Sequence, residues 1–219
     1  MKITLCTCRF YQRTPREKIA AMLAACRAAD VLCEIVPDLC YIAATDHDKL
    51  ERIASSDVVL ACQPRAVRAL LGNTGNARCI DLRTESLADI FAALSLTPVD
   101  VPVSEPVYDK LDSDWTPWFP VIDAERCTHC RKCVDFCMFG VYAVEAEKVR
   151  VIKPESCKTD CPACARICPQ NAIIFPKSDE ERLNGSLAEP VKPSDSDNIS
   201  LRERLKHRKG LRLFKEDTP

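Results

Sequence analysis

Two short runs of cysteine restrict the fold of this chain more than any other feature. They hold eight of the 15 cysteines found among the 219 residues. The first run has the spacing C-x2-C-x2-C-x3-C and consists of Cys127, Cys130, Cys133 and Cys137. The second has the spacing C-x3-C-x2-C-x3-C, ends before Pro169, and consists of Cys157, Cys161, Cys164 and Cys168. The near-identical spacings make the two runs internal repeats.

This spacing favours cubane iron–sulfur clusters over other uses of cysteine. Three closely spaced thiolates in one loop can bind three irons of a cubane, and a fourth on the following helix can serve a second cluster. Two alternatives are a zinc site and free thiols. Zinc sites, however, usually take two cysteines from each of two distant knuckles. His129 lies between two cysteines of the first run, and we expect it to face solvent beside the metal site rather than bind metal.

The segment 121–176 resembles bacterial-type ferredoxin domains that hold two [4Fe–4S] clusters. The resemblance implies that the first three cysteines of each run share a cluster with the last cysteine of the other run. One cluster is then bound by Cys127, Cys130, Cys133 and Cys168. The other is bound by Cys137, Cys157, Cys161 and Cys164. The implied fold has two pseudo-symmetric halves, each a short hairpin strand plus a helix. The implied role is outer-sphere electron transfer, because cysteine occupies every iron.

Two features depart from the ferredoxin pattern. Met138 follows Cys137 at a position where the family usually has proline. The loop before Cys161 is one residue longer than its counterpart in the first run and contains Lys158, Thr159 and Asp160. The longer loop makes Cys157 the ligand whose position most needs a structural test.

Residues 1–95 show alternating strand and helix patterns. Apolar runs predict strands over 2–5, 33–36, 58–61 and 77–82, and helical spacing predicts helices over 15–29, 46–54, 64–71 and 86–94. This order predicts a small parallel sheet in an α/β domain of Rossmann-like type, with helices on its faces. A dinucleotide-binding loop is excluded, because the first strand runs into Cys6-Thr7-Cys8 without the glycines that such a loop needs.

Four of the remaining cysteines follow strands of this predicted sheet: Cys6, Cys8, Cys40 and Cys62. The carboxyl ends of parallel strands meet at one edge, where open α/β sheets carry their sites. We therefore expect these four thiols to lie close together. Cys26, Cys33 and Cys79 lie within helix or strand patterns, and we expect them in the core.

The N-terminal domain resembles the N-terminal domain of the heterodisulfide reductase A subunit. The matching pieces are Leu5-Cys6-Thr7-Cys8, Asp38-Leu39-Cys40 and the stretch 59–65, VLACQPR. The resemblance implies a third [4Fe–4S] cluster bound by Cys6, Cys8, Cys40 and Cys62. Two alternatives remain open: packed free thiols, or a redox-active thiol pair or zinc site.

Two segments lie outside these domains. Residues 96–120 form a proline-rich, acidic linker, whose aromatic residues Trp115, Trp118 and Phe119 we expect to pack on the following domain. Residues 177–219 form a polar tail, expected to be disordered at least through Ser200. Its basic end, 201–215, is either a solvated helix, a docking segment for an acidic redox partner, or a contact for nucleic acid or membrane.

The net charge and the hydropathy of the chain argue against two classes of function. The net charge of −1 argues against binding to nucleic acid, and no apolar run is long enough to span a membrane. The N-terminus lacks the apolar core of a signal peptide, and abundant cysteines indicate a reducing compartment, so we expect a cytoplasmic protein. We expect an electron carrier or oxidoreductase subunit without catalytic residues of its own. Its partners would be flavin or iron–sulfur oxidoreductases.

Two rival functions remain. The first is a heterodisulfide-reductase-like enzyme subunit that carries out thiol or disulfide chemistry at the N-terminal cysteines and takes flavin from a partner. The second is a redox-sensing module that binds through the basic tail.

Overall fold

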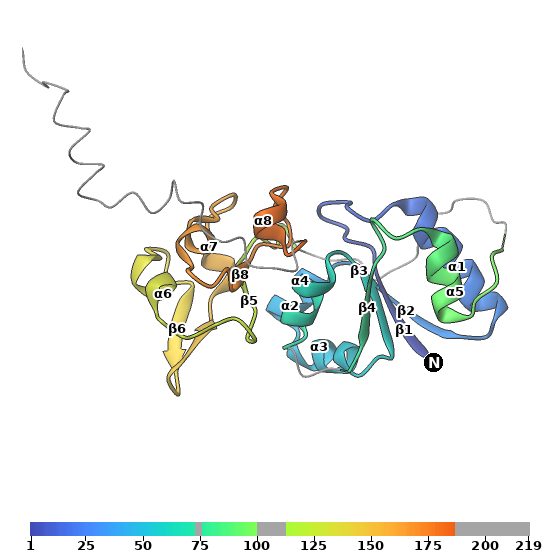
Figure 1. Cartoon of the computed structure of the whole chain (residues 1–219), viewed down its shortest axis with the longest axis horizontal. Coiled ribbons are helices and arrows are strands. Elements are labelled where there is room, and N and C mark those ends of the chain that lie inside the picture. Colours follow the sequence, from blue (N-terminus) through green and yellow to red (C-terminus); the bar gives the residue numbers. More distant parts are fainter. Residues whose placement is uncertain (73–75, 100–112, 187–219) are drawn as a thin grey trace, which may run out of the picture. The chain divides into compact units, whose positions relative to one another are not determined.

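A computed structural model describes residues 1–72, 76–99 and 113–186. Its N-terminal part is a parallel sheet with the strand order β2-β1-β3-β4 (Figure 1). The strands are β1 (Lys2–Cys6), β2 (Leu32–Val36), β3 (Val58–Ala61) and β4 (Arg78–Asp81). All four residues of β3 are buried, as expected for a strand covered on both faces. The predicted parallel sheet is therefore confirmed.

Helices cover both faces of this sheet (Figure 1). The helices of this part are α1 (Arg16–Ala28), α2 (Leu39–Thr45), α3 (His47–Ala54), α4 (Pro64–Leu70) and α5 (Leu87–Leu94). Apolar residues of α1 and α5 pack with Ile3 and Leu60 on one face. Apolar residues of α2, α3 and α4 pack with Val36 and Val59 on the other.

Side-chain caps fix where several helices begin. Asp46 accepts a hydrogen bond from the Lys49 backbone at the start of α3, and Ser86 accepts one from Asp89 at the start of α5. The sequence did not predict α2, whose N-cap Asp38 accepts hydrogen bonds from the backbone of Cys40 and Tyr41. A carboxylate at this position satisfies backbone donors that the helix leaves unpaired.

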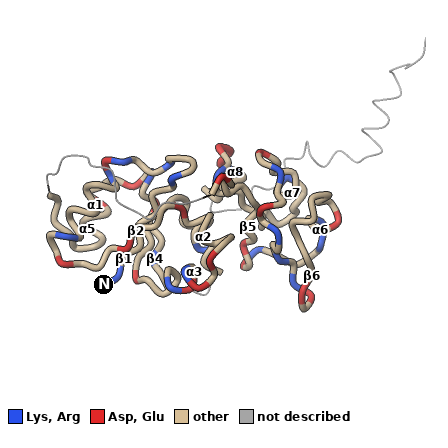
Figure 2. Tube along the Cα trace, turned by 180° about the vertical axis from the view of Figure 1, so that it is seen from behind, with Lys and Arg blue, Asp and Glu red and all other residues tan. Residues whose placement is uncertain are grey.

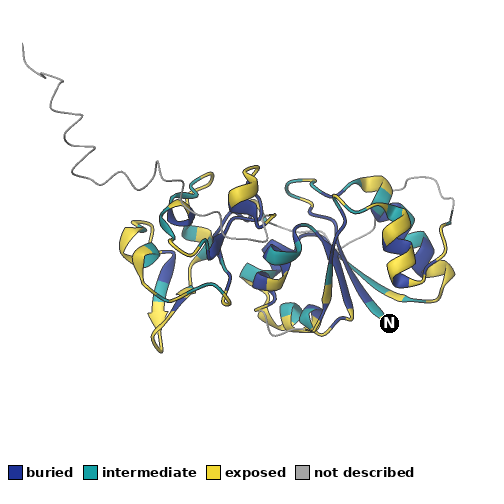
Figure 3. Cartoon of the chain, in the orientation of Figure 1, coloured by how far each residue is buried: buried dark blue, intermediate teal, exposed yellow. Residues whose placement is uncertain are grey.

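The cysteine-rich part contains two antiparallel strand pairs and two short helices. The pairs are β5 (Val121–Ile122) with β8 (Ile173–Ile174), and β6 (Tyr142–Glu145) with β7 (Lys148–Val151). The helices are α6 (Lys132–Phe136) and α7 (Ala163–Ile167), with a 3₁₀ turn, η1, at Pro154–Ser156. Figure 3 shows buried residues in β5 and β8, whereas α6 has none.

The linker aromatics divide between the two parts. Trp118 packs in the core of the cysteine-rich part, where its ring centroid lies 5.3 Å from that of Phe175. Trp115 instead lies 6.2 Å from Tyr41 of α2, and Phe119 joins the buried cluster of α2 and α4. Residues 100–112 of the predicted linker lie outside the described residues.

Residues 177–186 are folded, contrary to the expectation of a disordered tail from residue 177. The short helix α8 (Glu181–Asn184) lies within this stretch, and its Leu183 is buried in the cysteine-rich core. Gly185 ends α8 with a φ of +90°, and a Cβ there would lie 3.2 Å from Ala66 of α4. Glycine suits both the backbone conformation and the close approach. The remaining tail, including the basic segment 201–215, lies outside the described residues.

Charges of both signs are interspersed along the described chain (Figure 2). The part of the chain that the structure describes contains no helix that is long and apolar enough to cross a membrane.

Candidate metal centres

Four cysteines line one pocket of the cysteine-rich part: Cys127, Cys130, Cys133 and Cys168. The structure thus brings the last cysteine of the second run to the first three of the first run. Apolar side chains of Ile122, Val149 and Ile173 complete the lining. His129 and Arg131 adopt left-handed backbone conformations, with φ of 54° and 63°. These two positions curl the loop so that its cysteines face the same pocket.

The two runs use the same local structure. The third cysteine of each run lies in a short helix, α6 or α7, and the fourth is the residue that caps its C-terminal end. Four residues of helix separate them by about 6 Å along the helix axis. Cys133 and Cys137 are therefore displaced along α6, and Cys164 and Cys168 along α7. This displacement lets each run contribute to two sites.

The other four cysteines of the runs form a second neighbourhood: Cys137, Cys157, Cys161 and Cys164. Burial, together with nearby Cys164, Cys161 and Cys137, raises the pKa of the Cys157 thiol to about 12. The longer loop is accommodated by a turn in which the Cys161 backbone donates to the Lys158 carbonyl at 3.2 Å. Asp160 takes a left-handed φ of 59° within that turn. Cys157 thus lies beside the other three despite the extra residue.

Burial also raises the pKa of Cys133 and of Cys164 to about 11. These thiols are therefore protonated at neutral pH without metal, and metal binding must release their protons. Among the described residues, no three His, Cys, Asp or Glu side chains converge closely enough to hold a single ion. A cubane has a different requirement, because each thiolate binds its own iron.

His129 is half-buried rather than turned to solvent as expected. Its Nδ1 accepts a hydrogen bond from the Val149 backbone at 3.1 Å and lies 3.5 Å from the Cys127 sulfur. The lone pair of Nδ1 thus already accepts a hydrogen bond from the backbone of β7. The side chain fastens the first cysteine loop to the hairpin.

The N-terminal cysteines converge at the carboxyl edge of the parallel sheet. Cys6 ends β1, Cys62 directly follows β3, Cys40 lies in α2, and Cys8 lies in the loop after β1. In the order β2-β1-β3-β4, the chain leaves β1 and β3 in opposite directions, and open sheets place their sites at such a point. Cys6, Cys8 and Cys40 are each at most 5% exposed.

The four N-terminal thiols affect one another electrostatically. Burial raises the pKa of Cys6 and of Cys40 well above the ordinary value, and raises that of Cys62 to about 12. The charges of other members of the same group of four contribute to each of these rises, whereas the charge of Lys177 lowers all three pKa values. Cys26 and Cys33 lie on the other face of the sheet and hydrogen-bond to each other. All 15 cysteines belong to the described residues, and none forms a disulfide.

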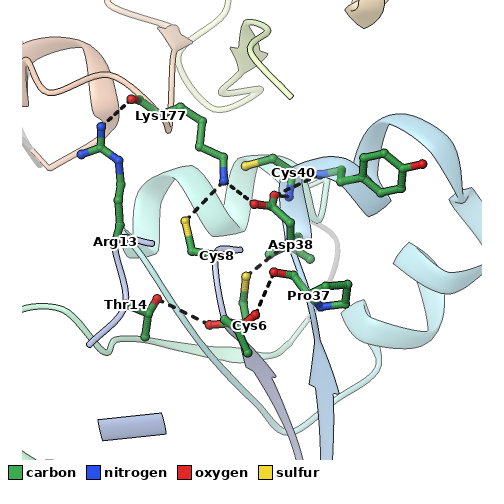
Figure 4. A network of polar contacts seen from close by, with 11 residues as sticks. Cys6, Cys8, Arg13, Thr14, Pro37, Asp38, Cys40 and Lys177 are labelled. Atoms are coloured by element: carbon green, nitrogen blue, oxygen red, sulfur yellow. Dashed lines mark hydrogen bonds and ion pairs between the residues drawn. The ribbon is translucent and has the colours of Figure 1, made fainter. Parts of the chain in front are cut away.

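Lys177 reaches the N-terminal cysteines from the end of the cysteine-rich part (Figure 4). Its Nζ donates to Asp38 Oδ2 at 2.6 Å and to Cys8 Sγ at 3.3 Å. Burial alone would lower the pKa of Lys177, but the charges of Cys40, Asp38 and Cys8 hold it well above its usual value. No local pattern in the sequence indicates this role of Lys177, because its partners lie more than a hundred positions earlier.

Backbone and side-chain donors around the thiols fit an iron–sulfur group. The Leu39 backbone donates to Cys6 Sγ at 3.3 Å, and the Ala172 backbone donates to Cys168 Sγ at 3.4 Å. Gln63, next to Cys62, is fully buried. Neither polar atom of its amide has a hydrogen-bond partner within the described part of the chain. A buried amide without a partner is costly, and a sulfur-rich group would provide acceptors for it.

Comparisons with known proteins agree with the geometry of the cysteine-rich part. Residues 119–181 match the family described as 4Fe-4S dicluster domain. An uncharacterized ferredoxin of Methanocaldococcus jannaschii is 48% identical over 68 residues, which are 31% of this chain and 46% of that protein. The chain thus spans less than half the length of that relative.

Two further relatives are covered more fully. A ferredoxin of Methanothermococcus thermolithotrophicus is 37% identical over 54 residues, 24% of this chain and 88% of that protein. The pyruvate synthase subunit PorD of M. jannaschii is 34% identical over 59 residues, 27% of this chain and 67% of that protein. Through its cysteine-rich part, this chain belongs to the ferredoxin family.

Proposed function

We propose that this iron–sulfur protein carries electrons through three [4Fe–4S] clusters. The proposed ligands of the first are Cys127, Cys130, Cys133 and Cys168. Those of the second are Cys137, Cys157, Cys161 and Cys164. Those of the third are Cys6, Cys8, Cys40 and Cys62. The observation that supports this proposal best is the convergence of twelve cysteines, from distant positions, into three groups of four.

The chemistry is single-electron transfer without bond formation to substrate. When bound, [4Fe–4S] clusters accept and release one electron at a time. The chain supplies four thiolates per cluster, which leaves no iron open for a substrate. Its other contributions are burial and N–H to sulfur hydrogen bonds, such as those from Leu39 and Ala172, and both influence the reduction potential.

The N-terminal domain supports a second candidate function. Its strand order and its cysteine-bearing edge support a Rossmann-like domain of the heterodisulfide reductase A kind. In that case the protein is an enzyme subunit, in which the N-terminal thiols exchange with a disulfide substrate and a partner supplies flavin. The specific observation in its favour is that Lys177 contacts Cys8, because a nearby cation favours the reactive thiolate.

The partner proposed here is an oxidoreductase complex with flavin or iron–sulfur centres. The support is the similarity to a protein named as a pyruvate synthase subunit. A reducing, cytoplasmic location is proposed with it, because 15 unpaired cysteines suit such a compartment.

Iron and acid-labile sulfide content of the anaerobically purified full chain tests the proposal. We expect about twelve irons per chain, four for each cluster. Cys62→Ser and Cys157→Ser should each lower the count by about four, because each removes a ligand of a different cluster. Cys79→Ser is the matched control, since this half-buried thiol on β4 donates a hydrogen bond to the Ala77 carbonyl at 3.6 Å and belongs to none of the three groups of four.

Two results would contradict the proposal. A wild-type count of about eight irons would remove the third cluster and favour thiol chemistry at the N-terminal site. Zinc without labile sulfide would overturn the electron-transfer role altogether.

A further inference from the structure

We propose that Lys177 is a fixed counter-charge of the N-terminal centre and raises its reduction potential. The inference rests on the third cluster of the proposed function. It goes beyond that function because it assigns a role to a residue that is not a ligand. Lys177 comes from the cysteine-rich part, after β8, while the centre lies at the edge of the parallel sheet.

The position of the ammonium group is held from several sides. The Lys177 side chain is 5% exposed, and its Nζ lies 3.3 Å from Cys8 Sγ. The Tyr11 ring centroid lies 5.1 Å from the same nitrogen. Arg13 donates a hydrogen bond to the Lys177 backbone carbonyl (Figure 4). A buried charge held in this way acts on its neighbours without the screening that water gives a surface lysine.

Asp38 partly offsets this charge but cannot cancel it at Cys8. The carboxylate lies 2.6 Å from the Lys177 ammonium and is fully buried. It also accepts hydrogen bonds from the backbone of Cys40 and Tyr41, at 3.0 and 3.2 Å. The ion pair is therefore a fixed dipole whose positive group contacts the Cys8 sulfur. The Asp38 charge acts in the opposite direction on the neighbouring Cys6 thiol.

Lys177 and Asp38 should therefore shift the reduction potential of the N-terminal centre in opposite directions. Reduction adds negative charge to a centre whose four ligands are thiolates. A nearby cation stabilises the reduced state, and a nearby anion destabilises it. Loss of the Lys177 charge should lower the potential, whereas loss of the Asp38 charge should raise it. An anchor with only a structural role would give neither shift.

The test is an EPR-monitored redox titration of the anaerobically purified full chain. The N-terminal signal is identified as the one that disappears in Cys62→Ser. In Lys177→Gln, the midpoint potential of this signal should fall by at least about 59 mV, which corresponds to a tenfold change in the one-electron equilibrium constant. Lys177→Arg should keep the wild-type potential to within a small part of that shift. The signals of the other two clusters should not move.

The control is Lys18→Gln. Lys18 is half-buried on α1 and donates to the carbonyls of Arg83 and Glu85, at 3.2 and 2.6 Å, rather than to sulfur. This variant removes a lysine that does not contact sulfur and should leave all three potentials unchanged.

If Lys177→Gln loses the N-terminal cluster, its potential cannot be measured, and a second variant, Asp38→Asn, tests the inference instead. Asp38→Asn keeps the helix cap, because asparagine caps as well as aspartate, and should raise the N-terminal potential. An unchanged potential in either variant with a full iron count would overturn the inference and leave the third cluster intact. A wild-type count of about eight irons would instead remove the third cluster, and this inference with it.

Discussion

Asp38 combines three roles in one buried carboxylate. It caps α2, which carries Cys40, and it pairs with Lys177 beside Cys8. It thereby connects the parallel sheet to a residue 139 positions later. The sequence marked Asp38 only as a neighbour of Cys40. The pairing itself was not predictable, because nothing in the local pattern around either residue indicates the other.

The eight cysteines of the two runs could be predicted as ligands because they lie close together in the chain, with the spacing typical of iron–sulfur ligands. The N-terminal four were predicted from the sheet topology together with the resemblance to the heterodisulfide reductase A subunit. The structure brings them together, because Cys6, Cys8, Cys40 and Cys62 all follow strand ends at one edge.

Asp38→Asn should reduce stability although it preserves the cap. The substitution leaves the Lys177 ammonium buried without its carboxylate, a loss of about 3 kcal/mol or more in the free energy of unfolding. For a chain of this size, the Tm of the cluster-loaded protein should fall by at least about 6 °C. Differential scanning calorimetry measures this value.

Asp179→Asn is the matched control for that experiment. Asp179 also pairs with a basic residue, Arg13, at 2.8 Å, but its side chain is 96% exposed. Exposed pairs contribute little, so the Tm should stay within about 2 °C of the wild type. An equal fall in Tm in both variants would show that the buried Asp38–Lys177 pair stabilises the fold no more than an exposed pair does.

At the scale of elements, caps and apolar periodicity predicted most of the N-terminal helices. The helices after Asp46 and Ser86 begin where the sequence indicated. Helix α2 was missed because its seven residues show little helical period and it lacks the first-turn proline that marks α4, a helix of the same length. Helix α8 was missed because its polar surroundings resemble a tail, although its Leu183 packs in the core of the cysteine-rich part.

Helix α4 shows how one element joins the sheet to the cysteine-rich part. Arg65 pairs with Asp123 at 2.8 Å and also donates to the Asn171 carbonyl. Both charged side chains are nearly buried, at 11% and 6% exposed. Arg126 also approaches Asp123, at 3.6 Å, so Asp123 keeps one partner when Arg65 is replaced.

Arg65→Met should therefore lower the free energy of unfolding by about 2 kcal/mol, less than a fully unpaired buried charge. The Tm should fall by roughly 4–8 °C. Arg68→Met, one turn further along α4 and exposed, is the control and should change the Tm by no more than about 2 °C. A similar fall in both variants would assign the effect to the helix rather than to the pair.

At the scale of the whole molecule, residues 1–188 form one compact unit. Two buried ion pairs, Lys177 with Asp38 and Arg65 with Asp123, connect segments that the sequence assigned to separate domains. Phe119 and Val121 also pack in the cluster of α2 and α4. These contacts between the two parts could not be predicted from the sequence, because composition indicates linkers and domains but not how domains contact each other.

Thermal unfolding should accordingly be a single cooperative transition. Loss of cluster absorbance and loss of helical circular dichroism should coincide in the loaded wild-type protein, because the parts share buried contacts. In the double variant Asp38→Asn/Arg65→Met, the two signals should separate. Separate transitions in the wild type would contradict the proposed cooperativity, and coincident transitions in the double variant would show that the two ion pairs are not its source.

The late position of Lys177 has a consequence for how the protein is made. A ribosome completes Cys8 169 residues before it reaches this lysine, an interval on the order of ten to thirty seconds. During that interval the nascent sheet can fold, but its thiols and the Asp38 carboxylate lack the ammonium group beside them. The N-terminal site therefore gains its counter-charge only after the cysteine-rich part has been made, even where the sheet itself has already formed.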